Sequence, residues 1–220
     1  MMEATKLTKD TKMNSCLDKV IIPELPELEF EDKTHTYRLN GMVIPSVSEI
    51  MEPLSNEKYK GISESTLNKA AEKGTAVHNS IENYIKFEID DVPPEHRGYF
   101  DAFLEWWETY HPEVVGSEIK TYHKLLRYGG TVDILVYIDG VLTLVDIKTT
   151  SALSDMTCGV QLEGYSQALK SHGIVVERKI ILHLKKDGKY AIREYPVSDS
   201  NRWRVFGSLK CVYDYILQSA

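Results

Sequence analysis

The segment Thr131–Lys148 constrains the fold more than any other part of the chain. Two apolar runs, TVDILVYI and VLTLVDIK, flank the dipeptide Asp139-Gly140, which is a strong signal for a two-residue hairpin turn. Apolar residues occupy both faces of the two predicted strands, and a strand pair that is apolar on both faces is a buried one. We therefore expect this hairpin at the centre of a sheet that is covered on both sides.

Helices and further strands are predicted around this hairpin. Helical spacing of apolar residues predicts helices over residues 63–86, 95–110, 160–173 and 201–217. Strands are predicted over 28–43 with a turn at Asn40-Gly41, and over 113–126, 176–185 and 189–197. This order predicts an α/β (α+β) fold with a central mixed β-sheet flanked by helices. Residues 1–27 are expected to form a flexible N-terminal arm, and residues 28–220 a single domain.

Composition excludes several classes of protein. The net charge of −7 argues against a protein that coats nucleic acid by charge alone, although bound metal ions can supply positive charge to an enzyme that acts on phosphates. Three cysteines far apart, with no C-x-x-C pair, exclude a four-cysteine iron–sulfur or zinc site. No run approaches the ~18 apolar residues of a membrane span, so we expect an intracellular protein without membrane contact.

Two aspartates are predicted to meet across the hairpin. If Ile138 pairs with Val141 across the turn, each step back along the first strand is matched by one step forward along the second. Asp133 then lies opposite Asp146. Lys148 lies two residues beyond Asp146 and shares its face. Opposed carboxylates repel unless something positive lies between them, and a divalent cation would serve. A solvated acidic face and a carboxylate–lysine cluster without metal are the alternatives.

A metal at this position suggests a reaction. Mg²⁺ takes oxygen ligands and commonly binds through one or two carboxylates and a substrate phosphate, so Asp133 and Asp146 are candidate ligands. The backbone carbonyl of Ile147, between Asp146 and Lys148, is a further candidate. Lys148 would point at the attacking water or at the charge that develops on the phosphate. Metal-dependent hydrolysis of a phosphodiester suits this set of residues.

These residues resemble a known family. Gly130-x-x-Asp133, Val145-Asp146-Ile147-Lys148-Thr149 and Gln161-x-x-x-Tyr165 are similar in letters and spacing to three motifs of the RecB-like branch of the PD-(D/E)xK nucleases. Gly74-Thr75-Ala76-Val77-His78 resembles the histidine motif of that branch, and HTYRLNGMVIPSVSEIM, from His35, resembles the front end of small phage-encoded and mitochondrial genome-maintenance exonucleases. The resemblance spans about two thirds of the chain and implies a restriction-endonuclease-like core.

The resemblance also implies roles for individual residues. It makes His78 a metal ligand beside Asp133 and Asp146, and it implies that Gln161 and Tyr165 contact DNA near the scissile phosphate. Because imidazole suits Mn²⁺ better than Mg²⁺, we expect Mn²⁺ to support activity at least as well. Three weaker candidates remain, each with a plain structural role as its alternative: Glu82, one helical turn from His78, Glu118 on the preceding strand, and Thr149 after Lys148.

The resemblance predicts a stand-alone nuclease without an iron–sulfur cluster. Val132 replaces the proline of the family name, which does not affect metal binding. The expected activity is metal-dependent hydrolysis of DNA with one or two Mg²⁺ or Mn²⁺ ions, as an exonuclease on DNA ends or single strands in replication, recombination or repair. A structure-selective or nicking endonuclease is the first alternative, and a catalytically inactive DNA-binding or assembly module is the second.

A recombination or replication protein is a possible partner, and the expected location is the cytoplasm of a bacterial or phage-infected cell. The oligomeric state is left open.

Overall fold

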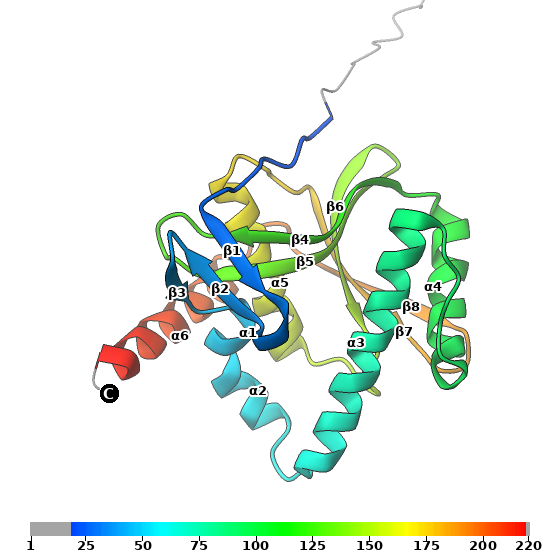
Figure 1. Cartoon of the computed structure of the whole chain (residues 1–220), viewed down its shortest axis with the longest axis horizontal. Coiled ribbons are helices and arrows are strands. Elements are labelled where there is room, and N and C mark those ends of the chain that lie inside the picture. The colour runs from blue at the N-terminus through cyan, green and yellow to red at the C-terminus, as the bar shows by residue number, and fades with distance from the viewer. Residues whose placement is uncertain (1–18, 219–220) are drawn as a thin grey trace, which may run out of the picture.

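Two β-sheets organise the chain in the computed structural model, which describes residues 19–218 (Figure 1). The strands are β1 (Leu28–Glu31), β2 (Thr36–Leu39), β3 (Met42–Ile44), β4 (Glu113–Tyr122), β5 (Gly129–Ile138), β6 (Val141–Lys148), β7 (Arg178–Leu184) and β8 (Tyr190–Tyr195). The helices are α1 (Val47–Ile50), α2 (Glu52–Lys58), α3 (Glu64–Phe87), α4 (Arg97–Tyr110), α5 (Asp155–Ser171) and α6 (Ser200–Gln218), with short 3₁₀ turns η1 (Asp32–Thr34) and η2 (Pro94–His96).

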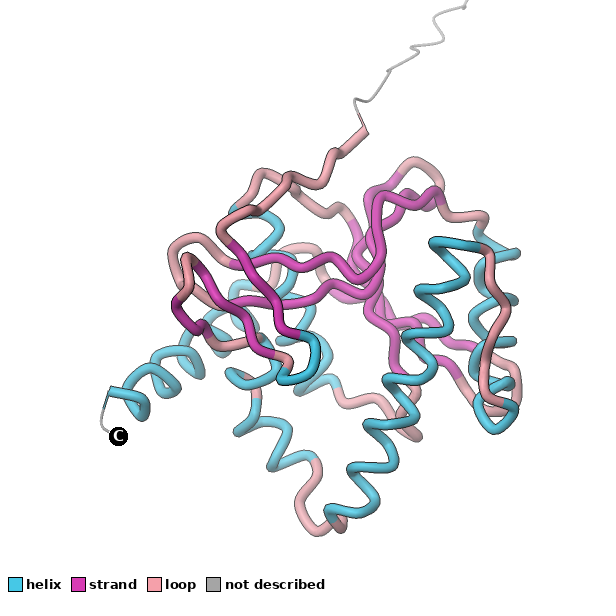
Figure 2. Tube along the Cα trace, viewed as in Figure 1, coloured by secondary structure: helices cyan, strands magenta, loops and turns pink. Residues whose placement is uncertain are grey.

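The larger sheet has the strand order β4-β5-β6-β7-β8. Neighbouring strands are antiparallel except for β6 and β7, which are parallel and are connected by α5. Figure 2 shows this sheet running through the middle of the molecule with helices around it. A mixed sheet flanked by helices was the predicted fold class, and the structure confirms it.

Local sequence signals account for where the elements begin and turn. Ser46 and Glu49 form the reciprocal capping box at the start of α1, and the Ser63 hydroxyl accepts the Thr66 amide at the start of α3. At the β5–β6 turn, Asp139 and Gly140 both have positive φ, at 53° and 76°, as a type I′ hairpin turn requires. Several boundaries differ from the prediction: α5 begins at Asp155, five residues before the expected start, and β4 ends at Tyr122, four residues before the expected end. The 3₁₀ turn η1 interrupts the strand region expected over 28–43, and α2 was not predicted.

Two apolar cores fill the space on either side of this sheet. One lies under α3 and α4 and includes Val77, Ile81, Phe100, Phe103, Trp106, Ile134, Val136, Val145, Ile147 and Leu182. The other lies under α1, α5 and α6 and includes Val47, Ile50, Val132, Leu135, Leu142, Leu144, Leu162, Tyr165, Ile181 and Phe206. Apolar residues therefore face both layers of helices, which explains why both faces of the central hairpin are apolar.

The small β1-β2-β3 sheet lies against the end of β5. The Gly129 amide donates to the Pro45 carbonyl at 2.8 Å, and Ser46 and Gly129 form an isolated parallel bridge. The hydroxyls of Tyr37 and Thr131 lie 2.5 Å apart. These contacts hold the small sheet beside the residues of motif Gly130-x-x-Asp133.

The two ends of the chain differ in what the structure adds. Residues 1–18 of the expected N-terminal arm lie outside the described residues, while the Val20 amide donates to the Tyr137 hydroxyl at 3.1 Å. In α6, apolar spacing predicts core packing throughout, and Phe206 is buried. That prediction is wrong beyond Leu209, because Val212 and Ile216 are 50% and 60% exposed where α6 extends past the body of the protein (Figure 1). Among residues 19–218, no helix has the length and apolar character needed to cross a membrane.

Candidate metal centre

The central hairpin opens at the end that carries the aspartates. The predicted register holds from Ile138↔Val141 to Ile134↔Val145, where the ladder ends. At the next residue, Asp133, a side-chain hydrogen bond replaces the backbone ladder: the Ile147 amide donates to Asp133 Oδ2 at 2.7 Å. Asp133 and Asp146 are therefore not a regular cross-strand pair, which corrects the simplest form of the hairpin prediction.

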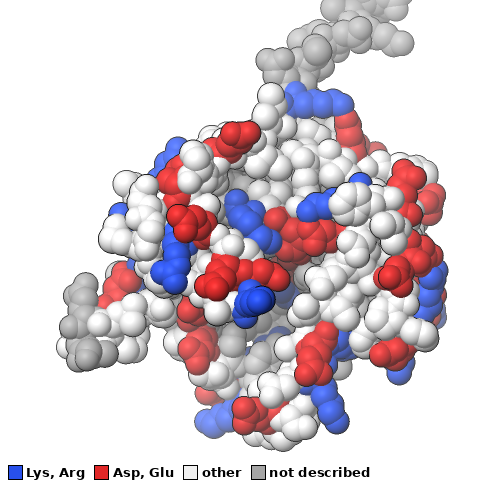
Figure 3. Space-filling view, viewed as in Figure 1, with Lys and Arg blue, Asp and Glu red and all other residues white. Residues whose placement is uncertain are grey.

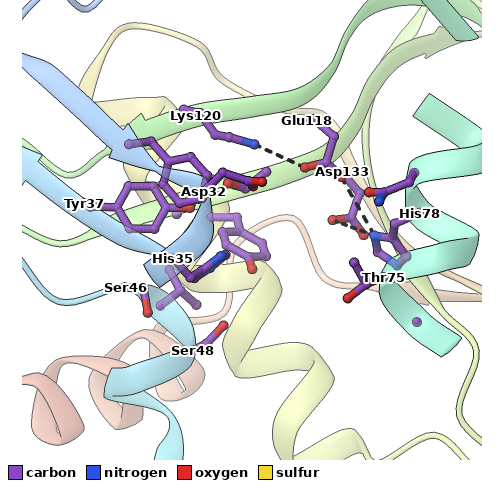
Figure 4. Close-up of a pocket in the computed structure, with 17 residues that line it drawn as sticks. Asp32, His35, Tyr37, Ser46, Ser48, Thr75, His78, Glu118, Lys120 and Asp133 are labelled. Carbon is purple, nitrogen blue, oxygen red and sulfur yellow. Dashed lines mark hydrogen bonds and ion pairs between the residues drawn. The ribbon is translucent and has the colours of Figure 1, made fainter. Parts of the chain in front are cut away.

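Three side chains from three elements converge at this opening. His78 Nδ1 of α3 lies 3.7 Å from Asp133 Oδ1 and 3.8 Å from Glu118 Oε1 of β4, and one ligand atom from each residue falls within 4.8 Å of the others (Figure 4). The other ring nitrogen, Nε2, lies 3.2 Å from the Ile147 carbonyl oxygen. When Nε2 carries the proton and donates to that carbonyl, Nδ1 keeps its lone pair directed toward the two carboxylates.

Burial and charge perturb all three groups. Burial acts to lower the pKa of His78, but the negative charges of Asp133 and Glu118 outweigh it and raise that pKa to about 9. Burial raises the pKa of Asp133 to about 6, with Asp146 adding to the effect and His78 opposing it. For Glu118, burial is outweighed by His78 and Lys120, which lower its pKa. The two carboxylates and one imidazole that converge here are groups that a bound positive ion would hold together.

Lys148 joins the cluster through Asp146. Asp146 is buried, and its Oδ2 lies 2.7 Å from Lys148 Nζ, an ion-pair contact without hydrogen-bond geometry. Burial acts to lower the pKa of Lys148, but Asp146 and Asp133 together raise it, so the ammonium form is the stable one. The structure thus pairs Lys148 with Asp146, while Asp133 acts on the lysine through its charge.

Gln161 and Tyr165 lie on the face of α5 that approaches this cluster. Gln161 Nε2 donates to the Tyr165 hydroxyl at 3.1 Å. Burial raises the pKa of Tyr165 well above its usual value, and the charges of Asp146 and Asp133 add to this. A Cβ at Gly130 would lie 2.9 Å from Tyr165 Cε1, so glycine permits the close approach of α5 to β5.

Glu82 and Thr149 occupy positions that the sequence left open. Glu82 forms an ion pair with Lys86 one turn along α3. The ring of His78 contacts the Ile147 carbonyl instead of Glu82. Thr149 is buried, and its carbonyl accepts Lys73 Nζ at 2.7 Å. Lys73 had no signal in the sequence, because its contact depends on the meeting of α3 with the segment after β6.

Two cavities meet at the cluster. One, of about 290 Å³, lies toward the small sheet, and the other, of about 620 Å³, lies between the segment after α2, α3, α5 and the segment that includes the end of β6. Gly74, His78, Asp133 and Tyr165 line both of them. In Figure 3, acidic atoms gather in a hollow near the middle of the face that includes the small sheet and α3, with basic atoms at its edge.

The donor set fits a divalent cation. One imidazole nitrogen and two carboxylate oxygens are ligands that Mn²⁺ accepts readily, and Mg²⁺ prefers the oxygens among them. Glu118, a weaker candidate from sequence, is one of the three grouped residues, while Asp146 lies next to the group and binds Lys148. The pairing of β4 with β5 brings Glu118 next to Asp133, and a single sequence reveals no such pairing.

Comparisons with known proteins give limited likenesses. No known family description matches the chain, and no curated protein matches it. Among solved structures, it aligns with a candidate exonuclease from Eubacterium rectale at 14% identity and a TM-score of 0.48, over 66% of each chain. It aligns with SSO0001 at 16% identity and a TM-score of 0.43, over 79% of this chain and 74% of that one. It aligns with LHK-Exo, solved in complex with dAMP, at 11% identity and a TM-score of 0.44, over 80% and 88%. At these values, the case for a function rests on the residues of the site.

Proposed function

We propose that this chain is a divalent-metal-dependent nuclease that hydrolyses phosphodiester bonds in DNA, with residues 28–220 as its catalytic domain. One observation carries the proposal: His78, Glu118 and Asp133 present three ligand atoms within 4.8 Å of one another, next to the Asp146–Lys148 ion pair. A metal-binding group and a half-buried lysine cation together match the demands of phosphate hydrolysis, in which negative charge must be stabilised.

Each residue has a defined task in this proposal. His78, Glu118 and Asp133 would hold the ion, with Asp146 as a further ligand. The Ile147 carbonyl, a candidate ligand from the sequence, would instead accept His78 Nε2 and so keep Nδ1 directed toward the ion. A bound divalent cation would supply Lewis-acid stabilisation of the phosphate and a more acidic water. Asp146 holds the Lys148 ammonium in place, and Lys148 would orient the attacking water or stabilise the charge that develops on the phosphate.

The residues after β6 and on α5 would position the strand. Gln161, Tyr165 and Thr149 line the 620 Å³ cavity together with Lys148. Their amide and hydroxyl groups are suited to phosphate and sugar contacts. We propose DNA ends or single strands as the substrate, which the resemblance to RecB-like nucleases favours. A nicking endonuclease and an inactive DNA-binding module are the competing functions.

Cleavage of labelled DNA tests the proposal. Linear and circular DNA, single- and double-stranded and labelled at either end, would be incubated with Mg²⁺, with Mn²⁺ and with EDTA. Lys148→Met and Asp133→Asn are expected to lower the rate by at least 100-fold. Lys170→Met, an exposed lysine in the last turn of α5, is the matched control and should cleave normally.

The outcomes separate the functions. Cleavage by the unmutated protein that is lost in EDTA and in Lys148→Met supports the nuclease. Cleavage of closed circles would favour the endonuclease. Binding of DNA without any cleavage in either metal would favour the inactive module, and unchanged cleavage by Lys148→Met would remove the site assignment.

A further inference from the structure

The 290 Å³ cavity has a wall that the proposed catalytic residues do not explain. Its lining includes Phe30, Asp32, His35 and Tyr37 from the small sheet and its η1 turn, across from His78 and Glu118 (Figure 4). The small sheet therefore reaches the metal cluster, although it lies about 40 residues before His78 in the chain. Its presence there needs an explanation beyond hydrolysis itself.

Away from the proposed metal ligands, this cavity offers little positive charge to a second phosphate. Among the described residues that line it, Lys120 is the only lysine or arginine, against the carboxylates of Asp32, Glu118 and Asp133. Lys120 Nζ is already bound to Glu118 Oε2 at 3.2 Å. If the metal holds one phosphate, the part of the cavity beyond Glu118 is therefore suited to an uncharged part of the same DNA strand.

Aromatic rings form one side of the cavity. The rings of Phe30 and Tyr37 lie 4.7 Å apart, and the His35 ring meets Phe30 edge-on at 5.1 Å. Lys120 Nζ lies over the Phe30 ring at 4.9 Å and Tyr37 is buried, whereas His35 is exposed. His35 is therefore the ring of this cluster that is accessible to an incoming planar group.

Polar groups without charge complete the lining. Ser48, Thr75 and Asn79 contribute hydroxyl and amide groups that can both donate and accept hydrogen bonds, whereas the hydroxyls of Ser46 and Thr131 are already bonded to the Glu49 amide and the Tyr37 hydroxyl. Hydroxyl and amide groups beside an aromatic ring suit a nucleobase, which has a flat apolar face and a polar edge. The volume of about 290 Å³ suits one nucleoside and is too small for a base pair.

From these observations we infer that the small sheet forms a subsite for one unpaired nucleobase, which stacks on His35 next to the phosphate at the metal centre. The inference rests on the proposed nuclease function and deepens it, because it assigns the strand-selecting contact to residues outside the catalytic motifs. His35 has φ 49° and ψ 40°, a left-handed conformation that places its side chain at the junction of η1 and β2.

A double-mutant cycle that combines protein variants with DNA variants tests the subsite. Fluorescein-labelled 12-nucleotide single strands, each with one abasic residue at a different position, would be bound to the protein with Ca²⁺ and measured by anisotropy. His35→Asn removes the imidazole and keeps a residue that tolerates the left-handed conformation. Met42→Ala, at an exposed residue of β3 that does not line the cavity, is the matched control.

The expected result is a loss of DNA affinity that either change causes alone and that does not increase when the two changes are combined. For the unmutated protein and for Met42→Ala, one abasic position should weaken binding by about 5-fold or more. His35→Asn should weaken binding of the intact strand by a similar factor and show no further loss at that position. If His35→Asn weakens binding of the intact and the abasic strand by the same factor, or does not weaken binding at all, the subsite is overturned.

The cleavage assay separates this inference from the proposed function. If the same protein cleaves DNA in Mg²⁺ but the cycle shows no coupling to His35, the subsite fails and the nuclease stands. If the protein neither binds nor cleaves DNA, both proposals fail.

Discussion

The buried ion pair between α5 and β7 offers a quantitative test of how the structure holds the candidate site. Lys179 binds Glu163, and both side chains are 1% exposed. The other Glu163 oxygen accepts Gln167 Nε2 at 2.9 Å. Glu163 lies between Gln161 and Tyr165 in the sequence, so this pair fixes the helix that presents them to the metal centre.

Removing one partner should be costly. Lys179→Met leaves the Glu163 carboxylate in a core from which water is excluded, and breaking a buried pair in this way costs about 3–5 kcal/mol. For a chain of this size, each kcal/mol corresponds to about 2–4 °C in the melting temperature, so we expect a decrease of about 6–20 °C. Replacing both residues, with Glu163→Met and Lys179→Met together, should recover most of this loss, because two buried apolar groups need no charge partner.

Urea denaturation followed by circular dichroism would measure these differences. Lys60→Met is the matched control, since Lys60 pairs with Glu57 at 3.9 Å on the surface and its loss should cost about 1 kcal/mol or less. A loss below about 1 kcal/mol for Lys179→Met would refute the reasoning. A double variant no more stable than the single one would refute it as well.

Three further predictions concern the metal centre. Mn²⁺ should support cleavage at least as well as Mg²⁺, and activity with Mg²⁺ but none with Mn²⁺ would contradict His78 as a ligand. Gly130→Ala places a Cβ 2.9 Å from Tyr165 Cε1 and should slow cleavage at least 10-fold while costing about 1–3 kcal/mol of stability; an unchanged rate in the DNA assay would count against a role for this contact. Glu118→Gln should weaken Mn²⁺ binding at least 10-fold by calorimetry, whereas Glu82→Gln, which alters a pair with Lys86, should not; equal effects would contradict the ligand assignment.

Local signals were sufficient for much of the fold. The Asp139-Gly140 turn fixes the register of the central hairpin, because its two positive φ angles leave one way for the flanking strands to pair. Apolar residues on both faces of these strands predicted helices on both sides of the sheet, and the two cores fill those spaces. The caps at Ser46 and Ser63 act within one helical turn, so the sequence contains the whole interaction.

The composition of the site depended on contacts between distant segments. Sequence order alone does not show that the ladder ends before Asp133 or that Glu118 of β4 comes to lie beside it, because both depend on how three strands pair. Helical spacing likewise predicted burial along all of α6, but the neighbouring elements do not cover its last turns.

The amino-acid sequence by itself determined the hairpin, the helices and the acids and lysine that converge at the end of the hairpin, because turn angles, periodicity and caps act over a few residues. Only the tertiary structure decided that Glu118 joins His78 and Asp133 in one group of ligand atoms, and that the small sheet forms a wall of the adjoining cavity. The physical reason is that these side chains come within a few ångströms of one another through the close packing of segments far apart in the chain. Local conformational preferences do not act over such distances.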